Sequence, residues 1–418
     1  MNDRKLISNS GYIFLEKFFK MATYFCAGIL IAREGGAAVL GLYSSVISVS
    51  VMMTAVSALG LNSLLAKEFI LNDDCKQLIC LHAVALRLIS ATLFGIFSVF
   101  IVYQFLMADI YISIFSMLFV VMASTQVLDV YFESQLNSKL IAKYKILAYC
   151  MGFMFKAYAV VAFGSAVSLL VAHFAELIIL ACACLRSALR EKAFVVRNLG
   201  ENLDSSYAKK LVKRGLPLVF SSIAAIVYMK IDLVFIVSYL GSAEAGLYSA
   251  AVRLCEGLFI LSAVMMPTIF PKLLHLYSKD MKLFERFMAK IFTSLFLVGC
   301  FFSIVGWLNA STIIEFLYGK EFSGSGRTFA IYSLAIPIIY IGDLFSRWIV
   351  ISENLNLSMM RHSLGLAINV SLNMLLIPIY GIEGAALASV MGYLGSIVIF
   401  SLASTKARQF YGFLGGWR

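Results

Sequence analysis

Long apolar runs follow one another along almost the whole chain, separated by short polar segments. A helix that crosses the hydrocarbon core of a bilayer needs about 20 mainly apolar residues, and most of these runs reach that length. The expected helices cover residues 11–33, 40–66, 78–105, 110–132, 144–163, 165–187, 214–240, 247–271, 285–307, 328–350, 357–377 and 381–404. The pattern therefore predicts an all-α polytopic membrane protein with about 12 transmembrane helices.

The composition supports a membrane protein and excludes several other classes. Of the 418 residues, 61% are hydrophobic and 14% are charged, whereas soluble domains average roughly 45–50% and 25%. The mean hydropathy is +0.91. These values exclude a soluble globular enzyme, a disordered chain and a nucleic-acid-binding protein. Because the cysteines and histidines show no metal-ligand spacing, we expect neither a metal site nor a cofactor.

The lysines and arginines are distributed unequally between the two predicted sides of the membrane. Taking the side of the N-terminus as reference, 23 of them fall in segments on that side, 3 on the other side and 8 within helices. Lys145 and Arg361 are among those assigned to the N-terminal side. Since cytoplasmic segments are enriched in Lys and Arg, both termini are predicted to be cytoplasmic.

A polar segment divides the chain nearly in half. Residues 188–213 are rich in basic side chains and form the longest segment between predicted helices. We interpret them as a cytoplasmic, amphipathic linker. The linker separates an N-terminal six-helix lobe, residues 1–187, from a C-terminal six-helix lobe, residues 214–404. Residues 405–418 are expected to form a cytoplasmic tail.

The two halves share a sequence pattern at a constant offset of 205 residues. The motif G-L-Y-S at 41–44 recurs at 246–249, and Gly36 recurs as Gly241. Small residues at these positions allow neighbouring helices to approach closely. Six helices of the same orientation in each half indicate a parallel repeat. The pattern predicts two lobes related by a pseudo-two-fold axis with a cavity between them, which is typical of transporters.

All five prolines lie in the second half of the chain. A proline inside a helix removes a backbone hydrogen bond and commonly kinks the helix. We therefore expect kinks at Pro267, Pro271 and Pro337, either as packing features or as places where this lobe bends during alternating access.

Ionisable residues inside the predicted helices are the candidates for function, because they are costly in a bilayer and usually face a partner or a cavity. With a rise of about 1.5 Å per residue, Arg87, Lys230 and Arg253 lie near the middle of their spans. The predicted substrate and ion translocation cavity comprises Lys20, Arg87, Lys156, Lys230, Asp232, Arg253, Glu256, Asp343 and Arg347. Glu176 and Asp129 are candidates for ion coupling.

Helical spacing predicts ion pairs within single helices, since residues three or four apart share a face. The pairs that satisfy this spacing are Glu16 with Lys20, Arg253 with Glu256, and Asp343 with Arg347. Lys230 and Asp232 are two apart and point to nearly opposite faces, so one of them must find a partner elsewhere. Each lobe contributes four cations and three acids to its helices. A cation-biased cavity suits a large anionic substrate that carries phosphates, and it suits a cationic drug poorly.

Four segments carry a resemblance to a known family: 240–273, its first-half echo 39–69, 318–326 and 377–393. The chain resembles the polysaccharide exporter family, and more narrowly the Wzx-type O-antigen flippases of the multidrug/oligosaccharidyl-lipid/polysaccharide exporter superfamily. The run G-L-Y-S-A-A-x-R-L-x-E, which contains Arg253 and Glu256, is the most specific motif.

The resemblance implies a multi-pass protein of the bacterial inner membrane. It implies that an undecaprenyl-pyrophosphate-linked oligosaccharide, the repeat unit of O-antigen or another polysaccharide, is moved from the cytoplasmic to the periplasmic leaflet. An ion gradient, of H⁺ or Na⁺, would drive alternating access of the two lobes. The implied partners are the lipid-linked substrate, the coupling ion and the bilayer, with a polysaccharide polymerase and a chain-length regulator as candidate protein partners.

Four other functions compete with this interpretation. A multidrug/cation antiporter of the same superfamily would be expected to have an acid-dominated cavity, whereas Glu16 is accompanied by Lys17 and Lys20. A lipid II flippase usually has fourteen helices. A membrane polysaccharide polymerase would be expected to have arginines in a large periplasmic loop. A glycosyltransferase would be expected to have paired acidic residues in its first outer loop. Since neither feature is present, we expect a transporter and not an enzyme.

Overall fold

The computed structural model describes residues 3–61, 64–65, 68–69, 76–135, 138–190, 205–354 and 356–412, and these contain helices and turns but no β-strand. Ten helical stretches of this part are long and apolar enough to cross a membrane. Two of them, Gly11–Ser57 and Asn356–Ala403, have 47 and 48 residues, about twice what one crossing needs. If each of these two crosses twice, the stretches supply the predicted twelve passes. The chain is a multi-pass, all-α membrane protein, as the sequence predicts.

Glycine breaks each of the double-length stretches. Gly36 interrupts α1 (Asp3–Ser57) with φ 77° and ψ 178°, and Gly381 interrupts α14 (Asn356–Leu394) with φ 60° and ψ −140°. Gly241, which precedes α9 (Ser242–Lys279), has φ 90° and ψ 176°. A side chain is strained in this region of backbone space, so glycine is needed there. Gly36 and Gly241 are equivalent positions of the predicted repeat, and their backbones have the same conformation.

The chain divides into two compact units, Met1–Ile226 and Val227–Arg418. The division falls inside α8 (Ser205–Leu240), C-terminal to the predicted linker. Of that linker, residues 191–204 lie outside the described part of the chain.

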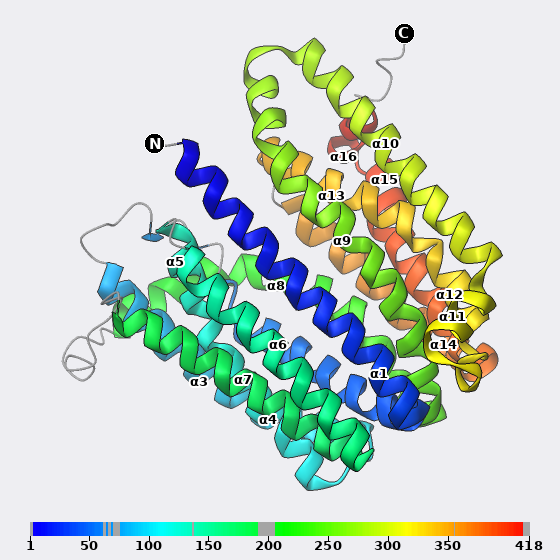
Figure 1. Cartoon of the computed structure of the whole chain (residues 1–418). Coiled ribbons are helices and arrows are strands. Elements are labelled where there is room, and N and C mark those ends of the chain that lie inside the picture. Colours follow the sequence, from blue (N-terminus) through cyan, green and yellow to red (C-terminus); the bar gives the residue numbers. More distant parts are fainter. Residues whose placement is uncertain are drawn as a thin grey trace. The chain divides into compact units, whose positions relative to one another are not determined.

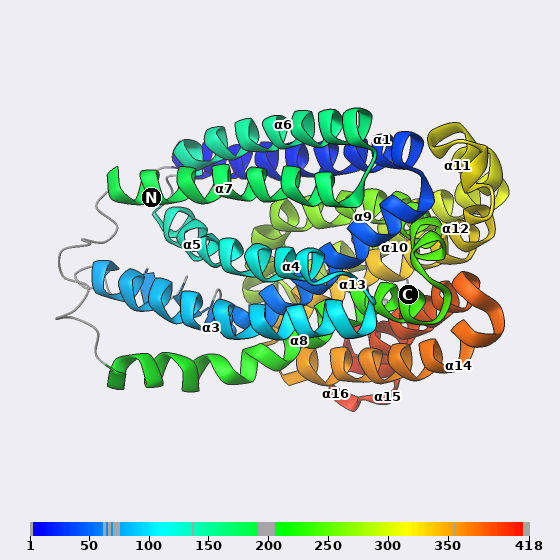
Figure 2. The same cartoon turned by 90° about the horizontal axis from the view of Figure 1, so that it is seen from below.

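In the first unit, α1 packs against the four long helices that follow it (Figures 1 and 2). These are α3 (Lys76–Phe105), α4 (Ile110–Ala123), α6 (Ser138–Phe163) and α7 (Ala166–Arg190). A short 3-10 turn, Ser124–Gln126, joins α4 to α5 (Val127–Ser134). The predicted helix 110–132 is therefore broken near its C-terminal end. The predicted helix 40–66 ends at Ser57, because Leu59 and Gly60 adopt positive φ values.

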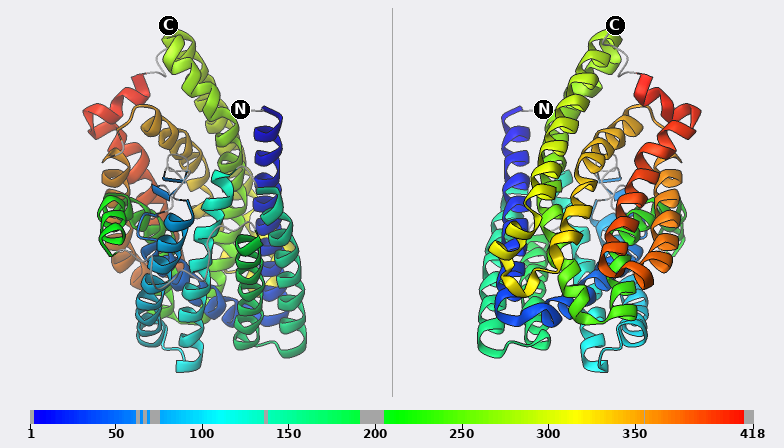
Figure 3. Two further views of the ribbon diagram at one scale, coloured as in Figure 1. Left: turned by 90° about the vertical axis from the view of Figure 1, so that its left-hand side faces the viewer. Right: turned by 90° about the vertical axis from the view of Figure 1, so that its right-hand side faces the viewer.

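In the second unit, α9 and α10 (Met281–Leu308) form a long antiparallel hairpin (Figure 3). The Asp280 carboxylate caps α10 by accepting a hydrogen bond from the Leu283 amide at 2.9 Å. Both helices pack against α13 (Ala335–Ile351), which in turn packs against α14. The remaining helices are α11 (Ala310–Tyr318), α12 (Ser325–Ser333), α15 (Phe400–Ala403) and α16 (Thr405–Gly412). Part of the predicted tail is thus helical.

The prolines behave differently from one another. α9 continues through Pro267 and Pro271 to Lys279, so the predicted end of this helix at residue 271 is wrong. The predicted helix 328–350 is interrupted at Leu334, between α12 and α13. Pro337 is the third residue of α13, and a proline in the first turn of a helix costs little because its missing N–H has no partner there.

Candidate functional site: buried charges in the two units

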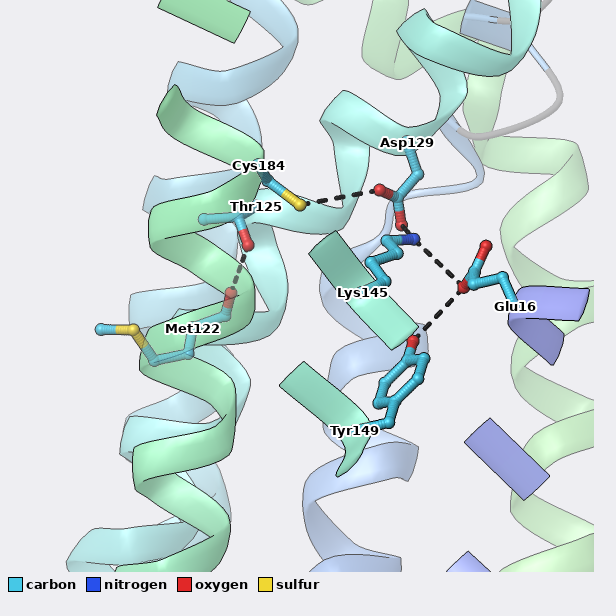
Figure 4. Close-up of polar contacts among 7 residues, drawn as sticks. All are labelled: Glu16, Met122, Thr125, Asp129, Lys145, Tyr149 and Cys184. Atoms are coloured by element: carbon cyan, nitrogen blue, oxygen red, sulfur yellow. Dashed lines mark hydrogen bonds and ion pairs between the residues drawn. The ribbon is translucent and has the colours of Figure 1, made fainter. Parts of the chain in front are cut away.

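Lys145 links four helices of the first unit through two carboxylates. Its Nζ lies 2.6 Å from Oδ2 of Asp129 and 3.4 Å from Oε1 of Glu16 (Figure 4). The Tyr149 hydroxyl donates to the same Glu16 oxygen at 3.3 Å, and the Cys184 thiol lies 3.8 Å from Oδ1 of Asp129. Two acids and one lysine meet among α1, α5, α6 and α7, so the group carries an excess of negative charge.

This cluster corrects two expectations. Lys145 was counted among the cations on the cytoplasmic side, at the start of the expected helix 144–163, and the structure buries it inside α6. The ion pair of Glu16 is with Lys145 and not with Lys20, which is exposed on α1. A signal for Lys145 exists in the sequence, because Lys145 and Tyr149 are four residues apart and share one face of a helix.

A second buried pair joins Lys156 on α6 to Glu176 on α7. The Lys156 ammonium donates to Oε2 of Glu176, and both residues are buried. Nδ1 of His173 lies 3.5 Å from the same oxygen, as the i,i+3 spacing of His173 and Glu176 predicts. The imidazole stands edge-on to the rings of Phe119 and Tyr43, with centroid distances of 4.9 and 6.2 Å.

Gly152 makes room for this pair. A Cβ atom at Gly152 would lie 2.5 Å from Cδ and 2.6 Å from Oε2 of Glu176. Real Cβ atoms do not approach other atoms so closely. The glycine therefore lets the Glu176 carboxylate reach Lys156 across the interface between α6 and α7.

In the second unit, Lys230 on α8 pairs with Glu256 on α9 at 2.5 Å. Lys230 thus finds its partner on another helix, as the two-residue spacing to Asp232 requires. The predicted pair of Glu256 with Arg253 is not formed within the described structure, because the carboxylate is turned to Lys230. Arg253 is itself buried in α9 with 3% of its surface exposed.

Asp232 is enclosed by neutral hydrogen-bond donors. Its Oδ1 accepts from Nδ2 of Asn373 at 2.7 Å and from Nδ2 of Asn369 at 3.1 Å. Its Oδ2 accepts from the Tyr248 hydroxyl at 2.5 Å and from the Ser389 hydroxyl. Asp232 is 2% exposed, and no cation among the described residues pairs with it. The asparagines and the serine of this cage are sites that the sequence analysis missed.

The Asn373 amide leaves one oxygen of the cage without a donor. Its Oδ1 is buried and has no hydrogen-bond partner in the described structure. Several oxygen atoms therefore surround a buried, uncompensated carboxylate. Such a site can hold a proton or a small cation, because either would neutralise the charge that burial makes costly.

Asp343 and Arg347 share a face of α13 but do not form the predicted ion pair in the described structure. Asp343 accepts a hydrogen bond from Ser262. The Arg347 guanidinium instead lies 5.6 Å from the ring centroid of Phe270. Arg361, which was counted among the cations on the cytoplasmic side, is buried in α14. Aromatic neighbours therefore take the place of a local salt bridge.

The remaining site residue, Arg87, lies in α3 with 2% of its surface exposed. The paired residues among the predicted site residues form separate clusters within each unit, and the single cavity expected from the sequence stays a prediction. Among the residues that the structure describes, no group of three or more His, Cys, Asp and Glu side chains is arranged to hold a metal ion.

Comparison with known proteins places this helical chain in a family. The sequence model described as "Polysaccharide biosynthesis protein" matches residues 41–326, which is more than half of the chain. The chain belongs to this family. The chain is also similar to an uncharacterized membrane protein of Methanocaldococcus jannaschii, 23% identical over 228 residues. The match covers 52% of this chain, and the chain spans about half, 51%, of that relative.

Solved structures show that this chain has the fold of MOP-superfamily transporters. It is similar to the lipid II flippase MurJ in an inward closed conformation, with a TM-score of 0.73 and 15% identity over 96% of this chain and 90% of that chain. It is also similar to an inward-facing multidrug resistance MATE family transporter, with a TM-score of 0.69 and 14% identity over 94% and 96%. A MOP-superfamily transporter from Pyrococcus furiosus gives a TM-score of 0.64 and 14% identity over 98% and 96%.

Proposed function

We propose that this protein is a flippase that moves a lipid-linked oligosaccharide across the membrane. The substrate is an undecaprenyl-pyrophosphate-linked repeat unit of O-antigen or a related polysaccharide. It passes from the cytoplasmic to the periplasmic leaflet of the bacterial inner membrane by alternating access, and both termini are cytoplasmic. Membership of the polysaccharide biosynthesis family and the shared transporter fold support this proposal.

The proposal of an anionic substrate rests on one observation, the burial of an arginine in each unit. Arg87 and Arg253 are 2% and 3% exposed in helices that otherwise consist mainly of apolar residues. Placing an arginine at the centre of a membrane helix costs about 3 kcal/mol on insertion scales, so such residues are retained chiefly where they serve function. Guanidinium groups bind phosphate oxygens through paired, charge-assisted hydrogen bonds. A pyrophosphate headgroup matches this chemistry, and a cationic drug does not.

The coupling ion, H⁺ or Na⁺, is proposed to bind at Asp232. Glu176 and Asp129, the candidates from the sequence, each form an ion pair with a lysine, and Asp129 shares its lysine with Glu16. Asp232 contacts neutral groups alone within the described structure. A carboxylate that lacks a protein cation is the one that gains most from binding an ion.

The test is translocation of a fluorescent polyprenyl-pyrophosphate oligosaccharide by the purified full-length protein in liposomes. The triple variant Arg87→Gln, Lys230→Gln, Arg253→Gln is expected to lose translocation. A matched control, Arg33→Gln, Lys320→Gln, Arg327→Gln, removes the same charge from exposed positions and is expected to retain it. Equal activity of the two triple variants would show that Arg87, Lys230 and Arg253 are not needed for translocation. Absence of translocation by the wild type would overturn the flippase itself.

A multidrug/cation antiporter is the second candidate, and the buried carboxylate of Asp232 is the feature that favours it. An antiporter would exchange an organic cation for H⁺ or Na⁺ at an acidic site. Cells that express this protein would then resist cationic dyes, and proton release from vesicles would follow dye addition. The flippase proposal expects neither effect.

A further inference from the structure

Arg361 is a buried cation that the proposed translocation mechanism does not use. It is 5% exposed, and its guanidinium lies 5.3 Å from the ring centroid of Phe345. Nη2 donates to Oγ of Ser346 at 2.8 Å, while Nε is buried without a hydrogen-bond partner in the described structure. No carboxylate of the described residues forms an ion pair with Arg361. A guanidinium whose buried Nε–H has no acceptor in the described structure is thus held inside the helix bundle.

Arg347 brings a second guanidinium to the same region. It lies on α13 over the ring of Phe270 from α9. Asp343 interacts electrostatically with both arginines, and it accepts a hydrogen bond from Ser262. Two guanidinium groups therefore share one carboxylate that neither of them contacts as an ion pair. This part of the second unit carries one positive charge in excess.

The position of the two arginines along their helices indicates the kind of anion. Arg361 is five residues after the start of α14 at Asn356, and Arg347 is four residues before the end of α13 at Ile351. At about 1.5 Å per residue, each lies roughly 6–8 Å from a helix end. In a helix that spans a bilayer, residues this close to one end lie nearer to the polar interfacial layer, which contains the lipid phosphate groups, than to the membrane centre. Arg347 is partly exposed and Arg361 is buried behind the surface.

We propose that Arg361 and Arg347 bind the phosphate group of an anionic lipid. The planar guanidinium donates paired hydrogen bonds to phosphate oxygens, and a cation-π contact with an aromatic ring helps to hold the group in place before the anion arrives. The Phe345 and Phe270 rings provide this contact for Arg361 and Arg347 respectively. A phosphate supplies the charge that balances the pair and an acceptor for the buried Nε–H of Arg361.

Two lipids carry this chemistry: a polyprenyl pyrophosphate and an anionic phospholipid. The choice of polyprenyl pyrophosphate as ligand rests on the proposed function, whereas phosphate binding by the two arginines does not. The experiment measures equilibrium binding of short-chain polyprenyl pyrophosphate, of phosphatidylglycerol and of inorganic pyrophosphate to the full-length protein in detergent, by native mass spectrometry. Binding of polyprenyl pyrophosphate alone identifies the carrier lipid, and binding of phosphatidylglycerol identifies a membrane headgroup site.

Arg361→Gln is expected to weaken binding of the preferred lipid by roughly tenfold or more, since a charge-assisted bond is lost. Arg361→Lys keeps the charge but loses the planar fork, so it is expected to recover only part of the affinity. Arg327→Gln removes an arginine whose side chain is 83% exposed in the same unit and should leave binding unchanged. If Arg361→Gln does not accumulate, Arg347→Gln, at a partly exposed position, takes its place with the same expectation.

Unchanged lipid binding in both Gln variants would overturn the phosphate site. Binding of inorganic pyrophosphate as tightly as lipid would overturn the assignment to a lipid. A wild type that binds a phosphate lipid through Arg361 but translocates no oligosaccharide would overturn the proposed function and leave the phosphate site standing. Translocation without arginine-dependent binding would do the reverse.

Discussion

Tyr43 and Tyr248 stand at equivalent positions of the internal repeat, but they contact different kinds of side chain. The Tyr248 hydroxyl donates to Oδ2 of Asp232 at 2.5 Å. The Tyr43 ring stands edge-on to the His173 imidazole, 6.2 Å between centroids. At the offset of 205 residues, Asp232 corresponds to Ala27. The repeat therefore reproduces the helices and the aromatic position, while the carboxylate exists in the second unit alone.

Asp232→Asn is expected to abolish dependence of translocation on an ion gradient. The amide keeps the size of the side chain but carries no charge for a proton or a cation to neutralise. The measurement compares translocation rates in liposomes with and without an imposed H⁺ or Na⁺ gradient. Glu315→Gln, at an exposed position of α11, is the matched control and should respond to the gradient as the wild type does. A gradient response that persists in Asp232→Asn would place the ion site elsewhere.

Gly152→Ala is expected to destabilise the first unit by about 1–3 kcal/mol, the usual cost of overpacking a core. The new methyl group would meet the Glu176 carboxylate and push it from Lys156. Thermal unfolding of the purified protein measures the effect. Gly11→Ala, also in a helix, has no atom within 4 Å of its new Cβ and should be neutral or slightly stabilising. Equal unfolding temperatures of the two variants would contradict the close contact.

Gly241→Ala measures the cost of backbone strain at a position where the new side chain would make no packing contact. No atom lies within 4 Å of a Cβ at Gly241, but φ is 90° there. The expected cost is about 1–3 kcal/mol of backbone strain, and Gly36→Ala should share it because its backbone conformation is the same. Gly412→Ala, which has open space and no positive φ, is the control for thermal unfolding. A neutral Gly241→Ala would mean that the turn before α9 can relax.

Lys145→Met is expected to cost roughly 3–5 kcal/mol, because removing one partner leaves buried charge uncompensated. Asp129 and Glu16 would both lose their shared cation. The double variant Lys145→Met, Asp129→Asn should recover part of the loss, since fewer charges remain buried. A double-mutant cycle on unfolding free energies measures this coupling. Strictly additive effects of the two substitutions would show that the pair contributes no interaction energy.

The positions of the long helices could be predicted from the sequence with errors of a few residues. The expected helix 165–187 is α7 at Ala166–Arg190, and the expected helix 285–307 is α10 at Met281–Leu308. Larger errors fall where local backbone chemistry intervenes, as at Leu334. The apolar pattern also did not predict that α9 continues through its two prolines. Packing against neighbouring helices can offset a lost backbone hydrogen bond, and the pattern of one segment does not show that packing.

Spacing along the chain predicted poorly which residues the buried charges contact. Three pairs expected within single helices gave way to pairs between helices or to aromatic contacts. Glu16 meets Lys145, 129 residues away in sequence, and Glu256 meets Lys230. Helical periodicity says which residues share a face, but it does not say which helix that face meets.

The sequence by itself determined that this chain is a helical membrane protein with a two-fold internal repeat. A bilayer leaves helices as the structure in which long apolar segments satisfy their own backbone hydrogen bonds, so twenty-residue apolar runs suffice for that conclusion. The tertiary structure decided the chemistry. It buried Lys145 and Arg361 and surrounded Asp232 with neutral donors. Electrostatic balance depends on distances between helices, and those distances are set by packing.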